Sequence, residues 1–220
     1  MLHDDNAVTR LAAAVTRIGT YEFPITITDS VRRFIEDIAE ITGLEIDPDN
    51  PQPALSKLGA ISRMIGATLR NTANPTMLDA GYKANVIPSS AEATIDTRFL
   101  PGQEHEWEAK VAELAGDDVD VEWLHKDIAV ETTFDGAIVD AMVASLKAED
   151  PGAQPVPYLM SGGTDAKSFS TLGIRCFGFS PLLLPSDLDF TSLFHGIDER
   201  VPVDALQFGC RVLARFLSAS

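Results

Sequence analysis

A histidine stands between an aromatic residue and a glycine near the end of the chain, at Phe194, His195 and Gly196. Imidazole is a common metal ligand and a general base near neutral pH, and a glycine lets the backbone turn sharply beside it. The charged residues 198–200 follow and could orient the ring or contact a ligand. A metal or a base needs partners, so a lone histidine is equally compatible with a structural role. His195 is a candidate whose role depends on the rest of the chain.

A second candidate is the turn Ser-Gly-Gly-Thr at residues 161–164, between an apolar stretch and a helical pattern that runs to Phe169. Glycine N–H groups and a helix start point at whatever occupies such a turn, so Gly163 and Thr164 could bind a carboxylate. A phosphate-binding P-loop is excluded because Lys167 follows an alanine where that motif has a glycine. A tight turn selected for its shape alone is the alternative.

Two polar residues, Asn85 and Arg98, fall in a stretch of alternating polar and apolar residues that predicts a β-hairpin. Pairing Lys83 with Asp96 brings like faces of the two strands together. In this register Asn85 and Arg98 share the polar face, about 13 Å apart at the rise of a strand. Arg98 could then reach a ligand between them, although a solvated face of a half-buried sheet gives the same pattern.

The elements that must position these residues follow from hydrophobic periodicity. Recurrence at three and four residues predicts helices within residues 7–18, 30–42, 55–69, 104–115, 135–146, 164–169 and 204–216. Besides the hairpin, strands are predicted at residues 119–124, 154–160 and 175–179.

This order of elements predicts two domains. Helices and alternating strands in residues 1–130 predict a two-layer α+β domain with an antiparallel sheet. Residues 131–220 alternate helices with apolar strands, which predicts an α/β domain. Catalytic loops in such domains lie at the carboxyl ends of strands, and both the 161–164 turn and the loop of His195 fall there.

The composition narrows the class of partner. The 33 acidic and 17 basic side chains give a net charge of −16, which disfavours nucleic acid and anionic membrane surfaces as partners. No secretory leader or long apolar run is evident, so we expect a cytoplasmic protein. Cys176 and Cys210 lie far apart in apolar surroundings, which predicts buried free thiols.

Taken in order, three motifs resemble the zinc-dependent aminoacylase, carnosinase and carboxypeptidase S family of metallopeptidases and deacylases. The run Asn85-Val-Ile-Pro with the segment that ends Asp-Thr-Arg98-Phe-Leu-Pro-Gly resembles the hairpin of the family's lid domain. Ser161-Gly-Gly-Thr-Asp-Ala resembles its glycine turn, and Phe194-His195-Gly-Ile-Asp-Glu-Arg-Val resembles the segment with its last metal ligand.

The resemblance implies that residues 1–130 are a lid or dimerisation domain and residues 131–220 the C-terminal part of a zinc-hydrolase catalytic domain. His195 would ligate one of two zinc ions. Asn85 and Arg98 would hold the substrate, a dipeptide or an N-acyl amino acid, and Gly163 and Thr164 would contact its free carboxylate. In the whole enzyme the two ions would activate a water and polarise the scissile carbonyl.

Other residues of the family pattern are missing from the printed sequence. The first histidine ligand, the bridging aspartate and the paired glutamates that include the general base belong in the family to a segment that would precede Met1. The lid histidine is missing too, and His3, His105 and His125 match no ligand motif. We therefore expect a fragment of such a hydrolase, inactive alone and forming homodimers through its lid domain.

Two alternatives remain open at this stage. The hairpin domain could serve only to dimerise, which would make the chain a non-catalytic interaction module. The 161–164 turn could instead bind an anion or act hydrolytically without metal. The motifs do not separate peptidase from deacylase, although the Asp-Ala-Gly-Tyr-Lys-Ala-Asn-Val-Ile-Pro run favours carboxypeptidase S-like members.

Overall fold

The computed structural model describes residues 5–47, 50–58 and 65–219, and the chain forms two compact units. The first, here the hairpin unit, comprises Met1–Thr26 and Leu69–Val130. The second, here the histidine unit, comprises Ile27–Thr68 and Glu131–Ser220. The predicted boundary near residue 130 coincides with one boundary between the units, but residues 27–68 group with the second unit instead of the first.

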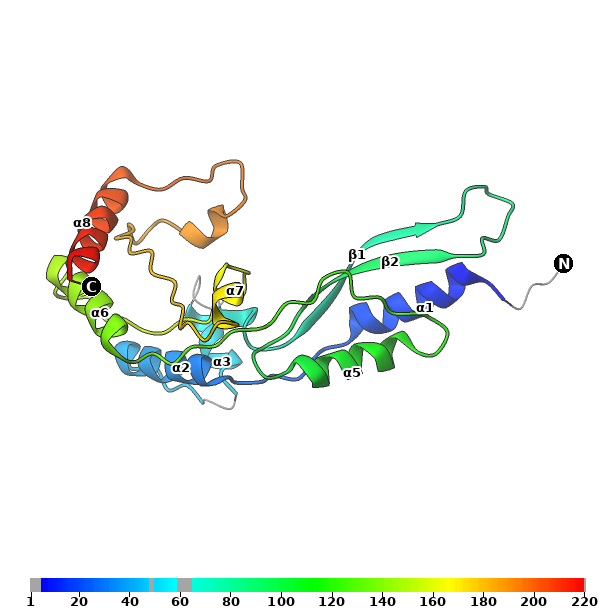
Figure 1. Ribbon diagram of the computed structural model, residues 1–220, viewed down its shortest axis with the longest axis horizontal. Helices are drawn as coiled ribbons and strands as arrows, with labels where there is room; N and C mark the ends of the chain where they lie inside the picture. Colours follow the sequence, from blue (N-terminus) through cyan, green and yellow to red (C-terminus); the bar gives the residue numbers. More distant parts are fainter. Residues whose placement is uncertain (1–4, 48–49, 59–64, 220) are drawn as a thin grey trace. The chain divides into compact units, whose positions relative to one another are not determined.

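The hairpin unit contains α1 (Ala7–Thr20), β1 (Thr72–Ala80), β2 (Ala91–Arg98) and α5 (Glu104–Ala115). α1 and α5 pack together beside the hairpin (Figure 1). The side chain of Asn6 caps α1 by accepting a hydrogen bond from the Val8 N–H at 3.0 Å, as the sequence predicts for a cap in this region. Both predicted helices of this unit are confirmed, whereas no strand forms at residues 119–124.

The hairpin is antiparallel, but its predicted register is wrong. Asp96 lies opposite Asn74, not Lys83, and a register irregularity lies between Pro75 and Met77. Alternation continues in the sequence to residue 86, yet β1 ends at Ala80 because Gly81 adopts a positive φ of 75° that turns the chain out of the ladder. The alternating pattern therefore covers a loop as well as the strand, and it does not show where the strand ends.

The core of the hairpin unit is aromatic. Trp107 is 2% exposed, and its ring lies 5.3 Å from that of Phe99 and 5.1 Å from that of Trp123. Around Trp107 pack the buried apolar residues Ile18, Phe23, Ala73, Val111 and Ala115. Arg17 of α1 donates to the carbonyl oxygens of Leu114 and Ala115, each at 2.7 Å, and so caps the end of α5.

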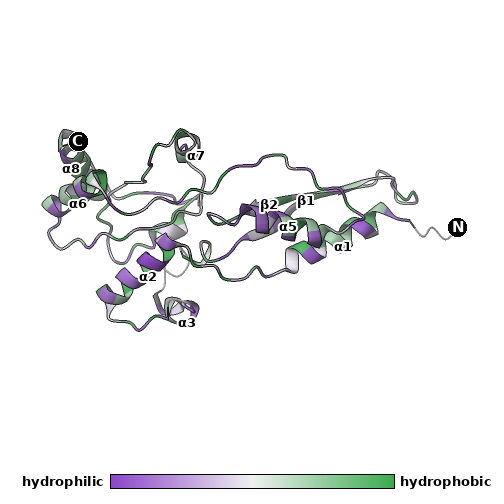
Figure 2. Ribbon diagram, turned by 60° about the horizontal axis from the view of Figure 1, so that its bottom comes forward, coloured by the Kyte–Doolittle hydropathy of each residue, from purple (hydrophilic) through white to green (hydrophobic). Residues whose placement is uncertain are grey.

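The histidine unit contains α2 (Asp29–Thr42), α3 (Gln52–Leu55), η1 (Ser56–Leu58), α6 (Ala137–Glu149), α7 (Ala166–Ser170), η2 (Phe190–Leu193) and α8 (Val203–Ala219). The Thr28 side chain caps α2 by accepting from the Val31 N–H, and the helix ends at Gly43, which has a positive φ of 68°. Charged residues occupy the exposed side of α2 (Figure 2). The third predicted helix is only partly within the described residues, since Ile61 lies outside them.

Residues 27–68 belong to this unit through contacts that periodicity cannot reveal. The ring of Phe34 on α2 lies 6.5 Å from that of Tyr158, and the Ser30 N–H donates to a carboxylate oxygen of Glu131 at 2.7 Å. A hydrophobic stripe identifies the buried face of a helix, but it does not identify what covers that face.

The predicted α/β layering is not present in the described part of the histidine unit. Residues 154–160 and 175–179 form no strand ladder, and the sheet of the described residues consists of β1 and β2. Apolar composition marks a segment that suits a strand, but a strand exists only when another segment completes its hydrogen bonds. The fold of the described residues is therefore α+β, with most of its regular structure helical.

The thiols are free, as predicted, but not buried. Cys176 is partly exposed and Cys210 is exposed on α8. The apolar neighbours of Cys210 in the sequence lie on other faces of the same helix, where Phe208 and Val212 are buried.

Candidate functional site

His195 occupies a strained position in a tight turn. The Gly196 N–H donates to the Leu193 carbonyl at 3.0 Å, Phe194 has φ −59° and ψ 126°, and His195 has φ 60°. These values describe a type II β-turn, whose third residue is normally glycine or asparagine. Among the described residues His195 is the one non-glycine residue with positive φ. Such a conformation costs about 1–3 kcal/mol and is concentrated at functional sites.

The segment before this turn is ordered by a capping aspartate. The Asp189 carboxylate accepts hydrogen bonds from the Ser192 N–H at 3.4 Å and from the Thr191 hydroxyl at 3.1 Å, which starts η2. The rings of Phe190 and Phe194 then meet edge to face at 5.2 Å. This short helical turn delivers the His195 side chain to an exposed position.

The surroundings of His195 do not form a metal site by themselves. Within residues 5–47, 50–58 and 65–219, no three His, Cys, Asp or Glu side chains gather closely enough to hold an ion. A catalytic zinc normally has three protein ligands. The described residues therefore do not fit a complete zinc site, and no step of a reaction can be routed through a metal held by them alone.

The glycine turn precedes α7 as expected, but no strand precedes it, and a cation lies beside it. The Thr164 hydroxyl accepts a hydrogen bond from the Ala166 N–H at 3.3 Å, at the start of α7. The Lys167 ammonium lies 3.5 Å from the point where a Cβ of Gly163 would stand. In the sequence, Lys167 serves only to exclude a P-loop. Its spacing of three residues from Thr164, one turn of a helix, was the signal that could have placed it at the site.

α7 itself has only five residues, so the helix adds little to anion binding at this turn. Gly163 and Thr164 are exposed. The chemical capacity of the turn therefore rests on its own backbone N–H groups and on Lys167.

Arg98 and Asn85 lie at opposite ends of the hairpin. Arg98 ends β2 opposite Thr72, and its Nε lies 3.3 Å from a carboxylate oxygen of Asp96 on the same face. Asn85 lies in the loop beyond Ala91, at the other end of that strand. Seven steps of about 3.3 Å separate Ala91 from Arg98 alone. The predicted separation of about four residues is wrong, because it assumed the incorrect register.

Asn85 lines an open pocket of about 640 Å³ within the hairpin unit. The start of α1 contributes Asp5 and Arg10, whose side chains form an ion pair at 2.7 Å, and the hairpin loop contributes residues 85–89. Asn85 is exposed there. The pocket combines an amide, an ion pair and apolar loop side chains, which suits a small polar ligand.

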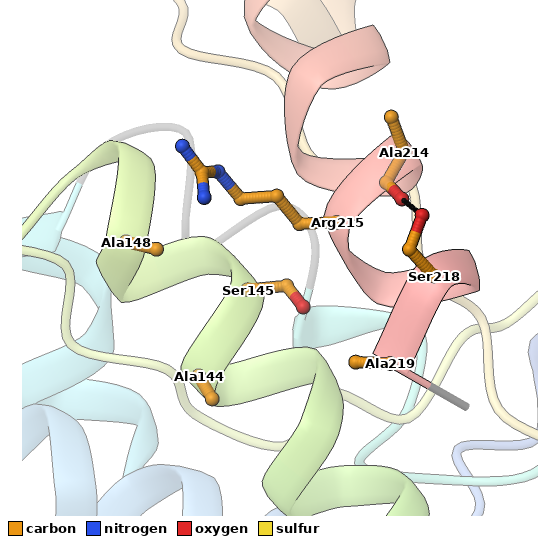
Figure 3. A pocket seen from close by; sticks show the side chains of 7 residues that line it. All are labelled: Ala144, Ser145, Ala148, Ala214, Arg215, Ser218 and Ala219. Carbon is orange, nitrogen blue, oxygen red and sulfur yellow. Dashed lines mark hydrogen bonds between the residues drawn. The ribbon is translucent and has the colours of Figure 1, made fainter.

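A second pocket, of about 560 Å³, lies between α6 and α8 (Figure 3). It is lined by Ala144, Ser145, Ala148, Ala214, Arg215, Ser218 and Ala219. Arg215 donates to Glu149 at 2.5 Å, and Arg211 donates to the same carboxylate at 2.8 Å, which lowers the pKa of Glu149 below its ordinary value. These hydrogen bonds join the two helices. None of the predicted site residues lines this pocket.

No helix in the described ranges combines the length and the apolar character needed to cross a membrane. His105 and His125 are exposed in the hairpin unit, as predicted for residues without a ligand motif.

Known proteins resemble this chain over most of its length. It is 30% identical over 157 residues to the probable carboxypeptidase S-like 2 of Dictyostelium discoideum, covering 69% of this chain and 30% of the relative. It is 30% identical over 165 residues to the N-fatty-acyl-amino acid synthase/hydrolase PM20D1 of Xenopus tropicalis, covering 70% and 31%. A putative succinyl-diaminopimelate desuccinylase of Mycobacterium tuberculosis is 28% identical over 175 residues, covering 74% and 46%.

A solved structure shares the fold. The M20 family metallo-carboxypeptidase Sso-CP2 of Sulfolobus solfataricus superposes with a TM-score of 0.56 at 18% identity, over 97% of this chain and 55% of that protein. The chain thus spans about a third of the length of the first two relatives and about half of this structure. The peptidase family M20/M25/M40 matches residues 15–219. This chain belongs to that family.

Proposed function

We propose that the chain is part of a metal-dependent hydrolase that cleaves an amide bond next to a free carboxylate, in a dipeptide or an N-acyl amino acid. The observation that carries the proposal is the positive φ of His195. A histidine in a glycine position lowers stability, so its presence there indicates that the side chain has a function. The names of the relatives, a carboxypeptidase, an N-acyl-amino acid hydrolase and a desuccinylase, support amide hydrolysis.

In this proposal His195 supplies one ligand to a zinc ion whose other ligands do not come from the described residues. The family membership supports a metal, and two zinc ions remain our proposal for the whole enzyme. The chain alone is proposed to be inactive, because one imidazole cannot hold a catalytic zinc. Exposed apolar side chains of the histidine unit support a longer active protein that would cover them, since Leu172 and Ile197 are 74% and 104% exposed.

The remaining candidate residues would bind the substrate. Arg98 would pair with the carboxylate, because its guanidinium matches two carboxylate oxygens in one plane. Gly163 and Thr164 would donate to a carboxylate at the glycine turn, with Lys167 supplying positive charge nearby. Asn85 would hydrogen-bond the polar part of the substrate from the hairpin loop. The hairpin unit as a lid that forms homodimers, and a cytoplasmic location, remain part of this proposal.

The test compares the 220-residue chain with the longest open reading frame that contains it. We expect about two zinc ions and hydrolysis of N-acyl amino acids or dipeptides only in the longer form. In that form His195→Ala should lose metal, whereas His125→Ala should not. Arg98→Ala should lower kcat/KM by about 10- to 100-fold through the lost charge-assisted hydrogen bonds, and Arg33→Ala, on α2, should leave it unchanged.

Three results would contradict the proposal. Stoichiometric zinc and turnover in the 220-residue chain would mean that its own acidic residues form a different site. Full metal content in His195→Ala of the longer form would remove His195 from the ligands. A metal-free, inactive longer form that is a stable dimer would favour the alternative, a non-catalytic interaction module.

A further inference from the structure

A glycine in the middle of α8 has a packing reason. Gly209 is buried, and glycine inside a helix is less favourable than alanine. A Cβ at this position would overlap the backbone carbonyl oxygen of Pro181 and would lie 3.6 Å from a methyl group of Leu182. The backbone at Pro181 therefore lies directly against α8, at a distance that only glycine permits.

The chain that starts at this contact leads to His195. From Pro181 it passes through a turn closed by the Leu188 N–H and the Pro185 carbonyl at 3.1 Å, then through η2 and the type II turn. It rejoins α8 at Val203, six residues before Gly209 and about 9 Å away along the helix axis. Residues 181–202 thus form a loop whose two ends are both held on α8.

We infer that Gly209 is a positioning residue, which fixes the Pro181 end of this loop on α8 and thereby sets the position of His195. One end of the loop is covalently part of the helix, so the other end is limited by its contacts with α8, which are the close approach at Gly209 and, two residues earlier, the ring of Phe179 at 5.6 Å from that of Phe216. An alanine at 209 would push Pro181 away from α8 and shift the turn that carries the imidazole. The importance of that shift for catalysis rests on the proposed function, whereas the shift itself does not.

The test uses the histidine ring signals of the full chain in NMR spectra. The chain has four histidines, and His105 and His125 of the hairpin unit serve as internal references. Gly209→Ala should move the His195 ring signals, leave those of His105 and His125 in place, and lower the Tm by about 4–8 °C through overpacking. The matched control is Gly178→Ala, because a Cβ at Gly178 meets nothing within 4 Å. It should leave the signals in place and should not lower the Tm.

A second pair keeps the inference testable where Gly209→Ala fails to fold. Leu182 is partly buried against Gly209, whereas the neighbouring Leu183 is 57% exposed. Leu182→Ala should move the His195 signals, and Leu183→Ala should not. Two results would overturn the inference: folded Gly209→Ala with His195 signals unchanged, or unfolded Gly209→Ala together with unchanged signals in Leu182→Ala. Neither outcome depends on metal or activity, so failure of the inference is distinguishable from failure of the proposed function.

Discussion

The hairpin unit and the histidine unit hold their candidate residues in different ways. In the hairpin unit, Arg98 is part of a strand pair backed by α1, α5 and an aromatic core around Trp107. In the histidine unit, His195 and the glycine turn lie on irregular segments, and each segment is tied to a helix by a few side chains or one close backbone contact. Arg98 is thus backed by buried area, whereas the candidate residues of the histidine unit depend on individual anchors, although the helices of that unit also bury apolar side chains such as Ile35 and Val212.

This difference predicts different responses to substitution. Loss of buried apolar area weakens a whole unit, because the core is one contiguous cluster. Loss of an anchor should instead displace one segment and leave the helices of the unit in place. Substitutions in the core and at the anchors should therefore differ in how far their effects spread.

Trp107→Ala should lower the free energy of unfolding of the hairpin unit by about 3–5 kcal/mol, the range for truncating a buried aromatic residue. Both tryptophans of the chain belong to this unit, so Trp123 still reports its unfolding in urea by fluorescence. Trp123→Ala is the matched control. Its side chain is 38% exposed, so the loss should be clearly smaller. Equal losses in the two variants would mean that the core is not centred on Trp107.

Arg175 is an anchor of the histidine unit with several contacts to one segment. Its Nη2 lies within hydrogen-bond distance of the carbonyl oxygens of Thr133 and Asp135, at 2.7 and 3.0 Å, and of their side-chain oxygens, at 3.1 and 2.8 Å, so its two hydrogens are shared among four acceptors. The guanidinium also lies 5.2 Å from the ring of Phe177. Together these contacts hold the segment of Arg175 against the start of α6.

Arg175→Lys should lower stability by about 1–2 kcal/mol, because the lysine side chain is one bond too short to place its nitrogen where Nη2 lies and has no planar group to stack on Phe177. Hydrogen exchange should show the change in residues 131–136 and 174–179 and not in α8. A uniform increase of exchange through the whole unit would contradict the idea of a local anchor. Arg33→Lys is the control, since the Arg33 guanidinium pairs with Asp37, one turn away on the same helix.

The same contrast explains what the sequence could predict. The caps and periodicity of α1, α2, α5, α6 and α8 are local, so these helices were found near their true bounds. The register of the hairpin was missed because alternation continued past Gly81, whose positive φ ends β1. The strands at 154–160 and 175–179 were predicted from composition, but strand pairing is a property of partners that no local pattern contains.

The site was predicted in the same uneven way. His195 was recognised from its neighbours, yet its positive φ could not be read from Phe-His-Gly alone, because φ is fixed by the η2 turn before it. Lys167 was visible in the sequence, but its proximity to Gly163 depends on the start of α7. The role of Gly209 depends on Pro181, which is 28 residues away in the chain.

The Glu149 carboxylate offers a smaller, pH-dependent test of the helices. Hydrogen bonds from Arg211 and Arg215 lower its pKa in the folded protein below the ordinary value that it has in the unfolded chain. The unfolded state therefore takes up a proton first as the pH falls. The stabilisation by these pairs is complete above the ordinary glutamate pKa and is lost as the pH falls through the lower folded value.

Glu149→Gln should be less stable than the natural chain at pH 7, and the difference should shrink at pH 3. Urea unfolding followed by far-UV circular dichroism at both pH values measures it. Glu36→Gln, at an exposed position of α2, is the control for a lost carboxylate. If the difference stays constant between the two pH values, the arginines do not stabilise the ionised form of Glu149.

The smallest expected effect concerns His195, and it separates backbone strain from side-chain loss. Alanine and glycine both remove the imidazole, but only glycine adopts a φ near 60° without steric cost. His195→Gly should therefore be more stable than His195→Ala by about 1 kcal/mol, with His195→Asn between them. Thermal unfolding of the three variants measures the order.

His125 supplies the opposite case, because its φ is not positive and its side chain is exposed. There glycine only adds freedom to the unfolded chain, so His125→Ala should be more stable than His125→Gly by about 0.5–1 kcal/mol. The order of alanine and glycine should thus reverse between the two histidines. The same order at both positions would mean that the turn at residues 193–196 relaxes readily, and the argument from strain to function would then fail for His195.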